Sequence, residues 1–367
     1  MAETEKKKTI LFYINTIGYP GGAERVIINL ARQFLEIGYD CMLCTSTLCE
    51  QEYSVPDGVQ RFIIEEEKIK QSAFKRNLKR IQYLRRLCKR FSPDYMVTFM
   101  EEANIRGIIA TRGLPIKLII SCRNDPQTTF SSLTMKFIGK VLYRFASSMV
   151  CQTEEAQNWF PINIQKKSKV ILNAVDNRFF EANYRGFENI SPVIVSLGRL
   201  EQQKRFDVLL LAFKRLLAKN PSPILYIYGT GSQKFELSEM IKTLELTGKV
   251  FLKGATDSVI SVLENASVFV LSSDYEGMPN ALLEALAVGV PSVSTDCPCG
   301  GPRSIIQNEK NGLLVPVGND EVLANAIYRI LEDREFAKKL SDNAIKMSKI
   351  FSPDCVFEHW RNFIEGC

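Results

Sequence analysis

The sequence contains one histidine, two tryptophans and no run of apolar residues long enough to span a bilayer. A membrane-spanning helix needs about 20 mostly apolar residues, so we expect none. Segment 1–8 is charged and no apolar stretch follows it, which argues against a secretory signal. The histidine, His359, lies outside the motifs described below, and we expect it to be an ordinary helix residue. These absences predict a cytoplasmic protein.

The sequence also lacks the patterns that hold metals. It contains no Asp-x-Asp motif. The ten cysteines are scattered, and the pair Cys41 and Cys44 has no second Cys or His pair at the spacing of a zinc site. We therefore expect reduced, mostly buried thiols, no bound metal and no cofactor.

The length and charge of the chain predict two domains. Its 367 residues exceed the roughly 100 to 200 of one domain. Hydrophobic residues make up 46% and charged residues 24%, which is typical of folded α/β or α+β proteins. Residues 1–180 hold 27 Lys and Arg against 18 Asp and Glu, a net charge of +9, whereas the remainder carries −3. Domains of opposite charge are expected to meet different partners.

Short apolar runs alternate with amphipathic stretches along nearly the whole chain, which is typical of parallel sheets covered by helices. The expected strands of the first half are 9–15, 39–45, 60–64, 94–100, 117–121, 148–152 and 169–172. Those of the second half are 192–197, 224–228, 250–252, 268–271, 291–294 and 312–315. Two such series predict an α/β protein with two doubly wound lobes.

The polar stretch 173–191 lacks periodicity and precedes the second strand series, so we expect the domain boundary there. The predicted domains are a first lobe at 1–185, a second lobe at 186–350 and a C-terminal helix at 351–367. That helix has Ser352 at the N-cap and Pro353 at the first helical position. We expect it to pack back on the first lobe.

The sequence SSDYEGMPNALLE, at 272–284, follows an apolar strand and enters a helix. Pro279 suits the first helical turn, whose free backbone N–H groups would face the crevice beyond the strand and bind an anion such as phosphate. Glu276 lies at its mouth and Glu284 eight residues further on. Ionised carboxylates accept hydrogen bonds only, so both suit a ligand rich in hydroxyl groups. An acidic turn that merely stabilises a helix is the alternative.

Two other strand-to-helix loops carry matching chemistry. Arg199 and Lys204 follow the strand 192–197, and two cations there could grip a diphosphate and stabilise the charge of a departing one. Surface cations are common in loops, and only their place in the same lobe favours this interpretation. Gly21 and Gly22 open a long helix after the first strand and would allow close backbone approach to a ligand. They do not form the G-x-G-x-x-G motif of dinucleotide oxidoreductases.

Five motifs occur in the order found in the retaining glycosyltransferases of family four, namely GGAERV at 21, GRLEQQKRFD at 198, YGTGS at 228, EGMPNALLE at 276 and CPCGGPRSII at 297. The sequence resembles that family along essentially its entire length. The resemblance implies the GT-B architecture of two Rossmann-like lobes with a cleft between them. It also implies that the second lobe binds a nucleotide diphosphate sugar, with UDP as the expected nucleotide, and that the first binds the acceptor.

The resemblance implies roles residue by residue. Glu276 would contact hydroxyls of the donor sugar and Glu284 the ribose, while Arg199 and Lys204 would bind the diphosphate. The remaining substrate-binding residues would be the loop glycines Gly21 and Gly22, the backbone of Gly277, Met278, Pro279 and Asn280, and Gly229 and Leu252 near the base. Many family members have a histidine after the strand 117–121, where this chain has Arg123 and Asn124. Its contact would pass to one of these two residues or be absent.

Two basic amphipathic stretches mark the first lobe. Residues 68–90 contain ten Lys or Arg and no acid, with an expected apolar stripe at Phe74, Leu78, Ile81, Leu84, Cys88 and Phe91. Phe137, Ile138, Val141 and Leu142 likewise leave Lys136, Lys140 and Arg144 on another face. Such helices could rest on an anionic membrane or be ordinary solvated faces. The basic stretch lacks the interleaved exposed aromatics or the recognition motif that would favour nucleic acid, so we expect no nucleic acid.

Together these features predict a metal-independent, retaining glycosyltransferase that moves a hexose or N-acetylhexosamine to a growing, lipid-linked glycan in bacterial polysaccharide synthesis. Its expected location is cytoplasmic, on the inner face of the membrane. The Arg-Asn-Asp form at 123–125 and the CPxGGP segment are similar to branches active in surface-glycan assembly. A nucleotide-sugar epimerase of the same fold and a silent sugar-nucleotide-binding subunit are the alternatives.

Overall fold

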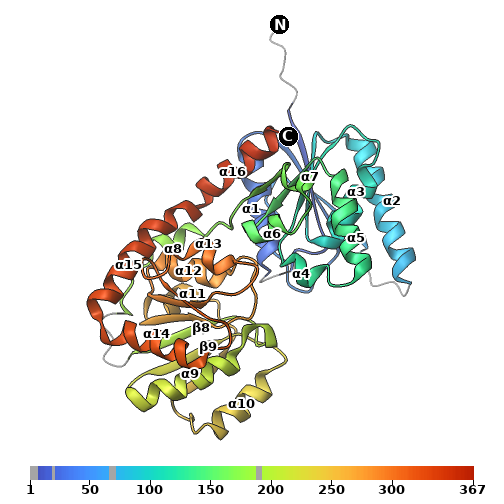
Figure 1. Cartoon of the computed structure of the whole chain (residues 1–367). Coiled ribbons are helices and arrows are strands. Elements are labelled where there is room, and N and C mark those ends of the chain that lie inside the picture. Colours follow the sequence, from blue (N-terminus) through green and yellow to red (C-terminus); the bar gives the residue numbers. More distant parts are fainter. Residues whose placement is uncertain (1–6, 19–20, 66–71, 187–191) are drawn as a thin grey trace. The chain divides into compact units, whose positions relative to one another are not determined.

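The computed structural model describes residues 7–18, 21–65, 72–186 and 192–367, and the chain divides into two compact units. Unit 1 comprises Met1–Leu172 and Phe357–Cys367, and unit 2 comprises Asn173–Val356 (Figure 1). The predicted α/β class with two parallel sheets is confirmed, one sheet of seven strands and one of six. All thirteen predicted strands are present, with ends that differ by no more than two residues.

The sheet of unit 1 is parallel and has the order β3-β2-β1-β4-β5-β6-β7. Its strands are β1 Thr9–Ile14, β2 Asp40–Thr47, β3 Gln60–Glu65, β4 Tyr95–Phe99, β5 Lys117–Ser121, β6 Ser148–Cys151 and β7 Ser168–Val170. Strand order reverses between β1 and β4. In doubly wound sheets, ligands bind outside the carboxyl ends of the strands at this switch point.

Helices cover both faces of this sheet. They are α1 Gly22–Glu36, α2 Ala73–Phe91, α3 Glu101–Thr111, α4 Pro126–Thr129, α5 Leu133–Val141, η1 Leu142–Phe145, α6 Glu154–Asn158 and α7 Ile162–Gln165. Figure 1 shows α1 on one face and α2 beside α3 on the other. Strands β1, β4 and most of β2 are buried on both faces and have largely apolar sequences, as expected for the inner strands of a parallel sheet.

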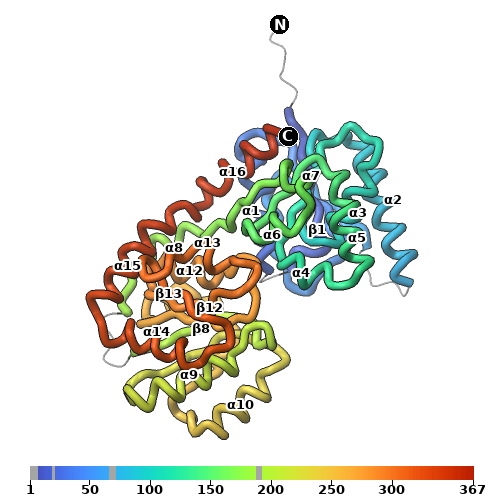
Figure 2. The backbone as a smooth tube through the Cα atoms, viewed as in Figure 1, coloured from blue at the N-terminus to red at the C-terminus, as the bar shows by residue number. Residues whose placement is uncertain are grey.

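The sheet of unit 2 is also parallel, with the order β10-β9-β8-β11-β12-β13 and a switch point between β8 and β11. Its strands are β8 Val193–Leu197, β9 Ile224–Tyr228, β10 Val250–Gly254, β11 Val268–Leu271, β12 Ser292–Thr295 and β13 Leu313–Val315. Its helices are α8 Asn177–Phe180, η3 Gln202–Lys204, α9 Phe206–Lys219, α10 Lys234–Thr243, α11 Val259–Glu264, α12 Asn280–Val288, α13 Gly301–Ile305, α14 Asp320–Glu332, α15 Arg334–Ser348 and η4 Lys349–Phe351. Helices α9 and α14 pack together, as do α12 and α15 (Figure 2).

The division between the units falls at 172/173 rather than at the expected 185/186. Residues 173–186 lack a strand but are held by unit 2. The backbone N–H of Arg185 donates to the carbonyl oxygen of Glu264 at 2.7 Å, and that of Asn183 donates to the Glu264 carboxylate at 2.8 Å. Of the stretch 173–191 that marked the expected boundary, 187–191 lie outside the described residues.

Helix α16, Pro353–Glu365, crosses the second division of the chain, at 356/357. Within unit 1, Phe357 meets Phe34 of α1 edge to face at 5.1 Å, and Trp360 stacks on Phe99 of β4 at 5.7 Å. The Trp360 side chain is fully buried. Residues that follow unit 2 in the sequence therefore complete the core of unit 1.

The expected apolar stripe of α2 is wrong in its first turns. Phe74 is 79% exposed and Leu78 is 45% exposed, whereas Leu84 and Cys88 are buried as expected. The inward positions of these turns are polar, because Asn77 binds α3 and Arg80 binds β3. Successive residues of a helix are rotated by about 100° around its axis. Phe74 and Leu78 therefore face solvent when Asn77 and Arg80 face inward.

The expected apolar stripe of α5 is also wrong at Phe137, whose side chain is 66% exposed. Residues 68–71, which begin the predicted basic stretch, lie outside the described residues. None of the helices described is both long and apolar enough to cross a membrane.

Candidate active site

The best-defined polar site of unit 2 lies at its switch point, where β8 and β11 are neighbours. The loop after β8 carries Arg199 and Lys204, and the loop after β11 carries Glu276. Lys204 Nζ lies 2.5 Å from Glu276 Oε1. The two side chains are 15% and 9% exposed, so the pair is largely shielded from water. The topology thus joins two predicted site residues that are far apart in the sequence.

Several hydrogen bonds fix the two loops around this pair. Ser273 Oγ donates to Glu276 Oε1 at 2.7 Å, and Ser272 Oγ donates to the carbonyl oxygen of Lys204 at 2.8 Å. The Gln203 amide donates to the carbonyl oxygen of Tyr275 at 2.8 Å. A site held from both sides is preorganised, so the cation and the carboxylate keep their positions without a ligand. Arg199, in contrast, is exposed.

The segment CPCGGP supports Glu276 through the backbone. Glu276 N–H donates to the carbonyl oxygen of Pro298 at 2.7 Å, and Cys299 N–H donates to that of Glu276 at 3.2 Å. A Cβ added to Gly301 would lie 1.9 Å from the carbonyl oxygen of Gly277. Glycine is therefore required at 301 for the two segments to approach. This supporting contact was not predicted from the sequence, where the segment served only as a family motif.

The loop after β9 packs onto the loop after β8. Gly198 N–H donates to the carbonyl oxygen of Tyr228 at 3.0 Å. Gly229 has a φ of +142°, and a Cβ there would lie 1.8 Å from the carbonyl oxygen of Gly198. Leu252, on the neighbouring strand β10, is half-buried. The predicted base-binding residues thus lie just after β9, which is next to β8, and on β10, which is next to β9.

Helix α12 begins one residue later than expected, at Asn280, with Pro279 as its N-cap. Asn173 Nδ2 donates to Asn280 Oδ1 at 2.7 Å and so orients this first turn. Glu284 lies within the helix and is buried, as is Met278 just before it. The N–H groups of a first helical turn have no partner within the helix, which leaves donors for an anion at this end. Gly277, half-buried, leads into this turn.

Unit 1 positions the remaining predicted residues. Gly22 begins α1 and Gly21 is its N-cap, with Gly21 N–H donating to the carbonyl oxygen of Gly18 at 2.9 Å. Glu24, in the first turn, has a raised pKa because burial disfavours its charged form. These glycines therefore form a half-buried helix entry, and their part in donor binding stays a prediction.

The two candidates for the missing histidine contact differ in exposure. Arg123 is buried, with its guanidinium 4.6 Å from the centre of the Phe99 ring and 5.8 Å from that of Trp360. Burial lowers the pKa of Arg123 to about 9. Asn124, the next residue, is exposed. Arg123 joins the aromatic core formed with α16, which leaves Asn124 as the accessible candidate; the role of each stays a prediction.

Sequence reasoning missed several residues that build the site. Ser273 binds Glu276, and Arg205 links the two loops because its Nη1 lies 2.9 Å from Asp274 Oδ1. Ser273 and Asp274 belong to the motif that drew attention to Glu276, but nothing in their spacing indicates a partner. Within the described parts of the chain, no group of three His, Cys, Asp or Glu residues could hold a metal ion.

Two family models match the chain. The model described as "Glycosyltransferase Family 4" matches residues 20–179, and the one described as "Glycosyl transferases group 1" matches residues 179–347. Together they cover the site residues of both units.

Similar proteins span the same length. Two N-acetylgalactosaminyltransferases of Campylobacter jejuni that act on diphospho-undecaprenol-linked glycans are similar. The α-1,4-N-acetyl-D-galactosaminyltransferase for GalNAc-GalNAc-diNAcBac-PP-undecaprenol is 27% identical over 97% of this chain and 98% of its own. The enzyme for N-acetylgalactosamine-N,N'-diacetylbacillosaminyl-diphospho-undecaprenol is 28% identical over 92% and 94%.

The structure of Anabaena HepE in complex with UDP and glucose superposes with a TM-score of 0.80 at 19% identity, covering 98% of this chain and 99% of that one. This likeness establishes the fold. The two family models and the full-length relatives place the chain in glycosyltransferase family four, with the GT-B fold and homology to the enzymes of bacterial surface polysaccharides.

Proposed function

We propose that this protein transfers a hexose or N-acetylhexosamine from a UDP-sugar to a growing lipid-linked glycan, with retention of configuration and without a divalent metal. The observation that carries the proposal is the shielded pair of Lys204 and Glu276 at the switch point of unit 2. A cation beside a helix N-terminus suits a diphosphate, and a carboxylate fixed next to it suits the hydroxyls of the attached sugar.

Transfer breaks the bond between the anomeric carbon and the diphosphate oxygen and forms one from that carbon to an acceptor oxygen. The acceptor proton passes to an oxygen of the departing diphosphate, so that the donor itself serves as the base. Lys204 stabilises the charge that develops on the diphosphate, and the exposed Arg199 on the same loop adds a second cation. Glu276 holds the sugar, and its bonds to Lys204 and Ser273 set the position of its Oε1.

The relatives support the choice of substrates. The two Campylobacter enzymes act on undecaprenyl diphosphate glycans, and HepE is solved with UDP. A lipid-linked acceptor lies at the membrane surface, so the proposed activity requires the enzyme to reach that surface. Exposed apolar side chains next to cations offer such a contact in unit 1.

The apolar side chains in question lie in the first turns of α2 and α5. Phe74 and Leu78 on α2, and Leu133 and Phe137 on α5, are between 45% and 86% exposed. Lys75, Lys79, Lys136 and Lys140 lie in the same turns. Both helices begin on the carboxyl side of the sheet, which is its ligand-binding side. Apolar groups can enter the interface while each cation adds about 1 kcal/mol on an anionic leaflet.

A donor panel tests the transferase proposal. Purified protein is incubated with UDP-, GDP- and ADP-sugars, with and without EDTA, and nucleotide release is measured. We expect release from a UDP-hexose or UDP-N-acetylhexosamine that EDTA does not reduce. Lys204→Met should abolish most of it, whereas Lys214→Met, which removes an exposed lysine of α9 in the same unit, should not. Activity that disappears with EDTA and returns with manganese contradicts the metal-free mechanism.

Flotation with liposomes tests the membrane contact. Wild type should bind vesicles containing anionic lipid, and binding should weaken with salt. Replacing Phe74, Leu133 and Phe137 with Ser should weaken it at every salt concentration. The matched control replaces Arg86 and Arg90, near the other end of α2, with Gln. If this control loses as much binding as the apolar variant, the contact is not at the first turns.

A further inference from the structure

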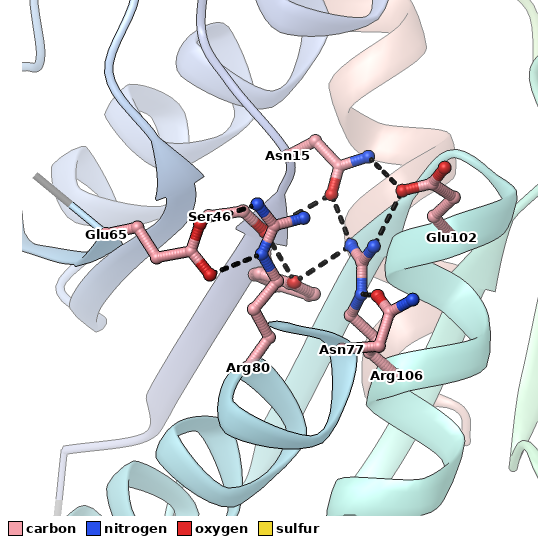
Figure 3. A network of polar contacts seen from close by, with 8 residues as sticks. Asn15, Ser46, Glu65, Asn77, Arg80, Glu102 and Arg106 are labelled. Carbon is pink, nitrogen blue, oxygen red and sulfur yellow. Dashed lines mark hydrogen bonds and ion pairs between the residues drawn. The ribbon is translucent and has the colours of Figure 1, made fainter. Parts of the chain in front are cut away.

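Unit 1 has its own polar network at its switch point, outside the carboxyl ends of β1, β2, β3 and β4 (Figure 3). Asn15 follows β1, and Glu102 follows β4 in the first turn of α3. Asn15 Nδ2 donates to Glu102 Oε2 at 3.2 Å, so this bond spans the two strands between which the order reverses. The network occupies the place in unit 1 that Lys204 and Glu276 occupy in unit 2.

Arg106 of α3 is the centre of the network and is buried. Its Nη2 donates to Glu102 Oε2 at 2.6 Å and its Nη1 donates to Asn15 Oδ1 at 2.5 Å. Its Nε donates to Asn77 Oδ1 of α2 at 2.9 Å, and its Nη1 lies 3.4 Å from the Tyr13 hydroxyl. Figure 3 shows these groups converging from β1, α2 and α3. With so many partners, the guanidinium is fixed.

A second, largely buried ion pair closes the network on the side of β3. Arg80 donates through Nε and Nη2 to the two carboxylate oxygens of Glu65, at 3.1 and 2.9 Å. Such a fork uses both oxygens of Glu65. Ser46, at the end of β2, completes the wall by donating to Asn15 Oδ1 at 3.2 Å. These groups are committed to one another and are poor candidates for ligand contacts.

Glu102 differs from all of them in exposure. Its side chain is 65% exposed while that of Arg106 is 5% exposed. The bonds from Asn15 and Arg106 both reach Oε2, and the described part of the chain provides no hydrogen bond to Oε1. Burial works against its charge, but the bonds from Arg106 and Asn15 lower its pKa. Glu102 is therefore an ionised carboxylate whose Oε2 is held by Arg106 and Asn15. Its Oε1 has no hydrogen-bond partner among the described residues.

Two buried polar atoms nearby also lack partners among the described residues. They are Glu101 Oε1, directly after β4, and Ser121 Oγ, at the end of the neighbouring strand β5. Met100 joins these two strand ends, since its N–H donates to the carbonyl oxygen of Ser121 at 3.3 Å. Its φ of +77° is strained for a residue with a side chain. Strain and unpaired buried atoms are typical of a ligand site.

We infer that Glu102 binds the acceptor glycan, with its carboxylate accepting a hydrogen bond from a sugar hydroxyl while Arg106 and Asn15 hold it in place. This inference rests on the proposed transferase function and names the acceptor side of the same reaction. The chemistry favours a neutral, hydroxyl-bearing ligand. A carboxylate repels anions, and Arg106 already balances its charge, so a cation gains little.

The test separates the acceptor from the donor. With the UDP-sugar that wild type uses, nucleotide release is measured without acceptor and then with methyl glycosides of four hexoses and N-acetylhexosamines. A polyprenyl diphosphate disaccharide of N-acetylhexosamines in detergent is the lipid-linked probe. The variants are Glu102→Gln and Glu102→Asp. The matched control is Glu36→Gln, an exposed residue at the end of α1, close to where β2 begins and away from the carboxyl ends of the strands. Thermal unfolding is recorded for each.

Glu102→Gln should lower kcat/KM for the acceptor about 10- to 100-fold, the loss expected for a charged hydrogen bond. Release without acceptor and KM for the donor should stay unchanged, which a general structural defect would not permit. Glu102→Asp should retain part of the activity, and Glu36→Gln all of it. An acceptor-dependent rate that persists in Glu102→Gln overturns the inference and leaves the transferase standing. A wild type without any acceptor-dependent rate instead contradicts the proposed function.

Discussion

Replacing Lys204 with methionine should affect stability as well as turnover. The Glu276 side chain is 9% exposed, and after the cation is removed the bond from Ser273 would be its remaining contact among the described residues. Removing one partner of a buried pair costs about 3 to 5 kcal/mol. Because Ser273 and partial hydration remain, we expect about 2 to 3 kcal/mol. For a unit of this size, about 2 to 4 °C per kcal/mol gives a melting temperature roughly 5 to 10 °C lower.

The complementary variant, Glu276→Gln, should cost less stability. Lys204 is more exposed and can turn its ammonium towards water, so we expect about 1 kcal/mol. The double variant combines Lys204→Met with Glu276→Gln and leaves neither of these charges unpaired. The double-mutant cycle should therefore give a coupling free energy of about 1 to 3 kcal/mol between the two residues. Urea unfolding of wild type, the two single variants and the double variant, monitored by far-UV circular dichroism, measures this coupling.

Turnover provides a second, independent readout. Loss of a preorganised cation should raise the barrier by about 2 to 4 kcal/mol, which is about 30- to 1000-fold in kcat/KM. Because stability and turnover depend on the same contact, both must change. A Lys204→Met protein that unfolds within about 0.5 kcal/mol of wild type would refute the buried pair, whatever its activity. Near wild-type kcat/KM would refute the diphosphate contact.

Three further outcomes are expected. Gly301→Ala should lower both stability and activity, because its Cβ would lie 1.9 Å from the Gly277 carbonyl oxygen; unchanged melting would contradict this. Trp360→Ala should cost about 3 to 5 kcal/mol in unit 1, measured by urea unfolding, since the side chain is fully buried against Phe99. Thiol reagents should label Cys49 and Cys355 in the native protein, while the seven buried cysteines react only after denaturation. Burial raises the pKa of Cys41 to about 12, so the Cys41 thiol should remain unlabelled in the native protein at pH 9.

The strands could be predicted because parallel strands buried on both faces read as short apolar runs between turn residues. The unit boundary could not, because residues 173–186 have no periodicity and are held by hydrogen bonds to the distant residue Glu264. The start of α2 misled for a related reason. Phe74 and Leu78 have helical spacing, but Asn77 and Arg80 occupy the inward line, where they meet a polar network rather than an apolar core.

The site divides in the same way. Glu276 and Lys204 were predicted from the loops that carry them, but their contact depends on β8 and β11 being neighbours, which only the strand order decides. Glu102 and Arg106 gave no signal at all. An acid and a base four residues apart on a helix are ordinary surface features, and only the topology sets them beside Asn15.

The passage of α16 into unit 1 has a consequence for how the protein is made. A ribosome releases residues in order, so unit 1 emerges with β4 and α1 lacking Trp360 and Phe357 until unit 2 has been synthesised. During that interval Phe34 and Phe99 lack their aromatic partners, and a nascent chain with apolar surface is prone to aggregation. A fragment that ends at residue 172 should therefore need chaperones or a supplied α16 peptide to remain in solution.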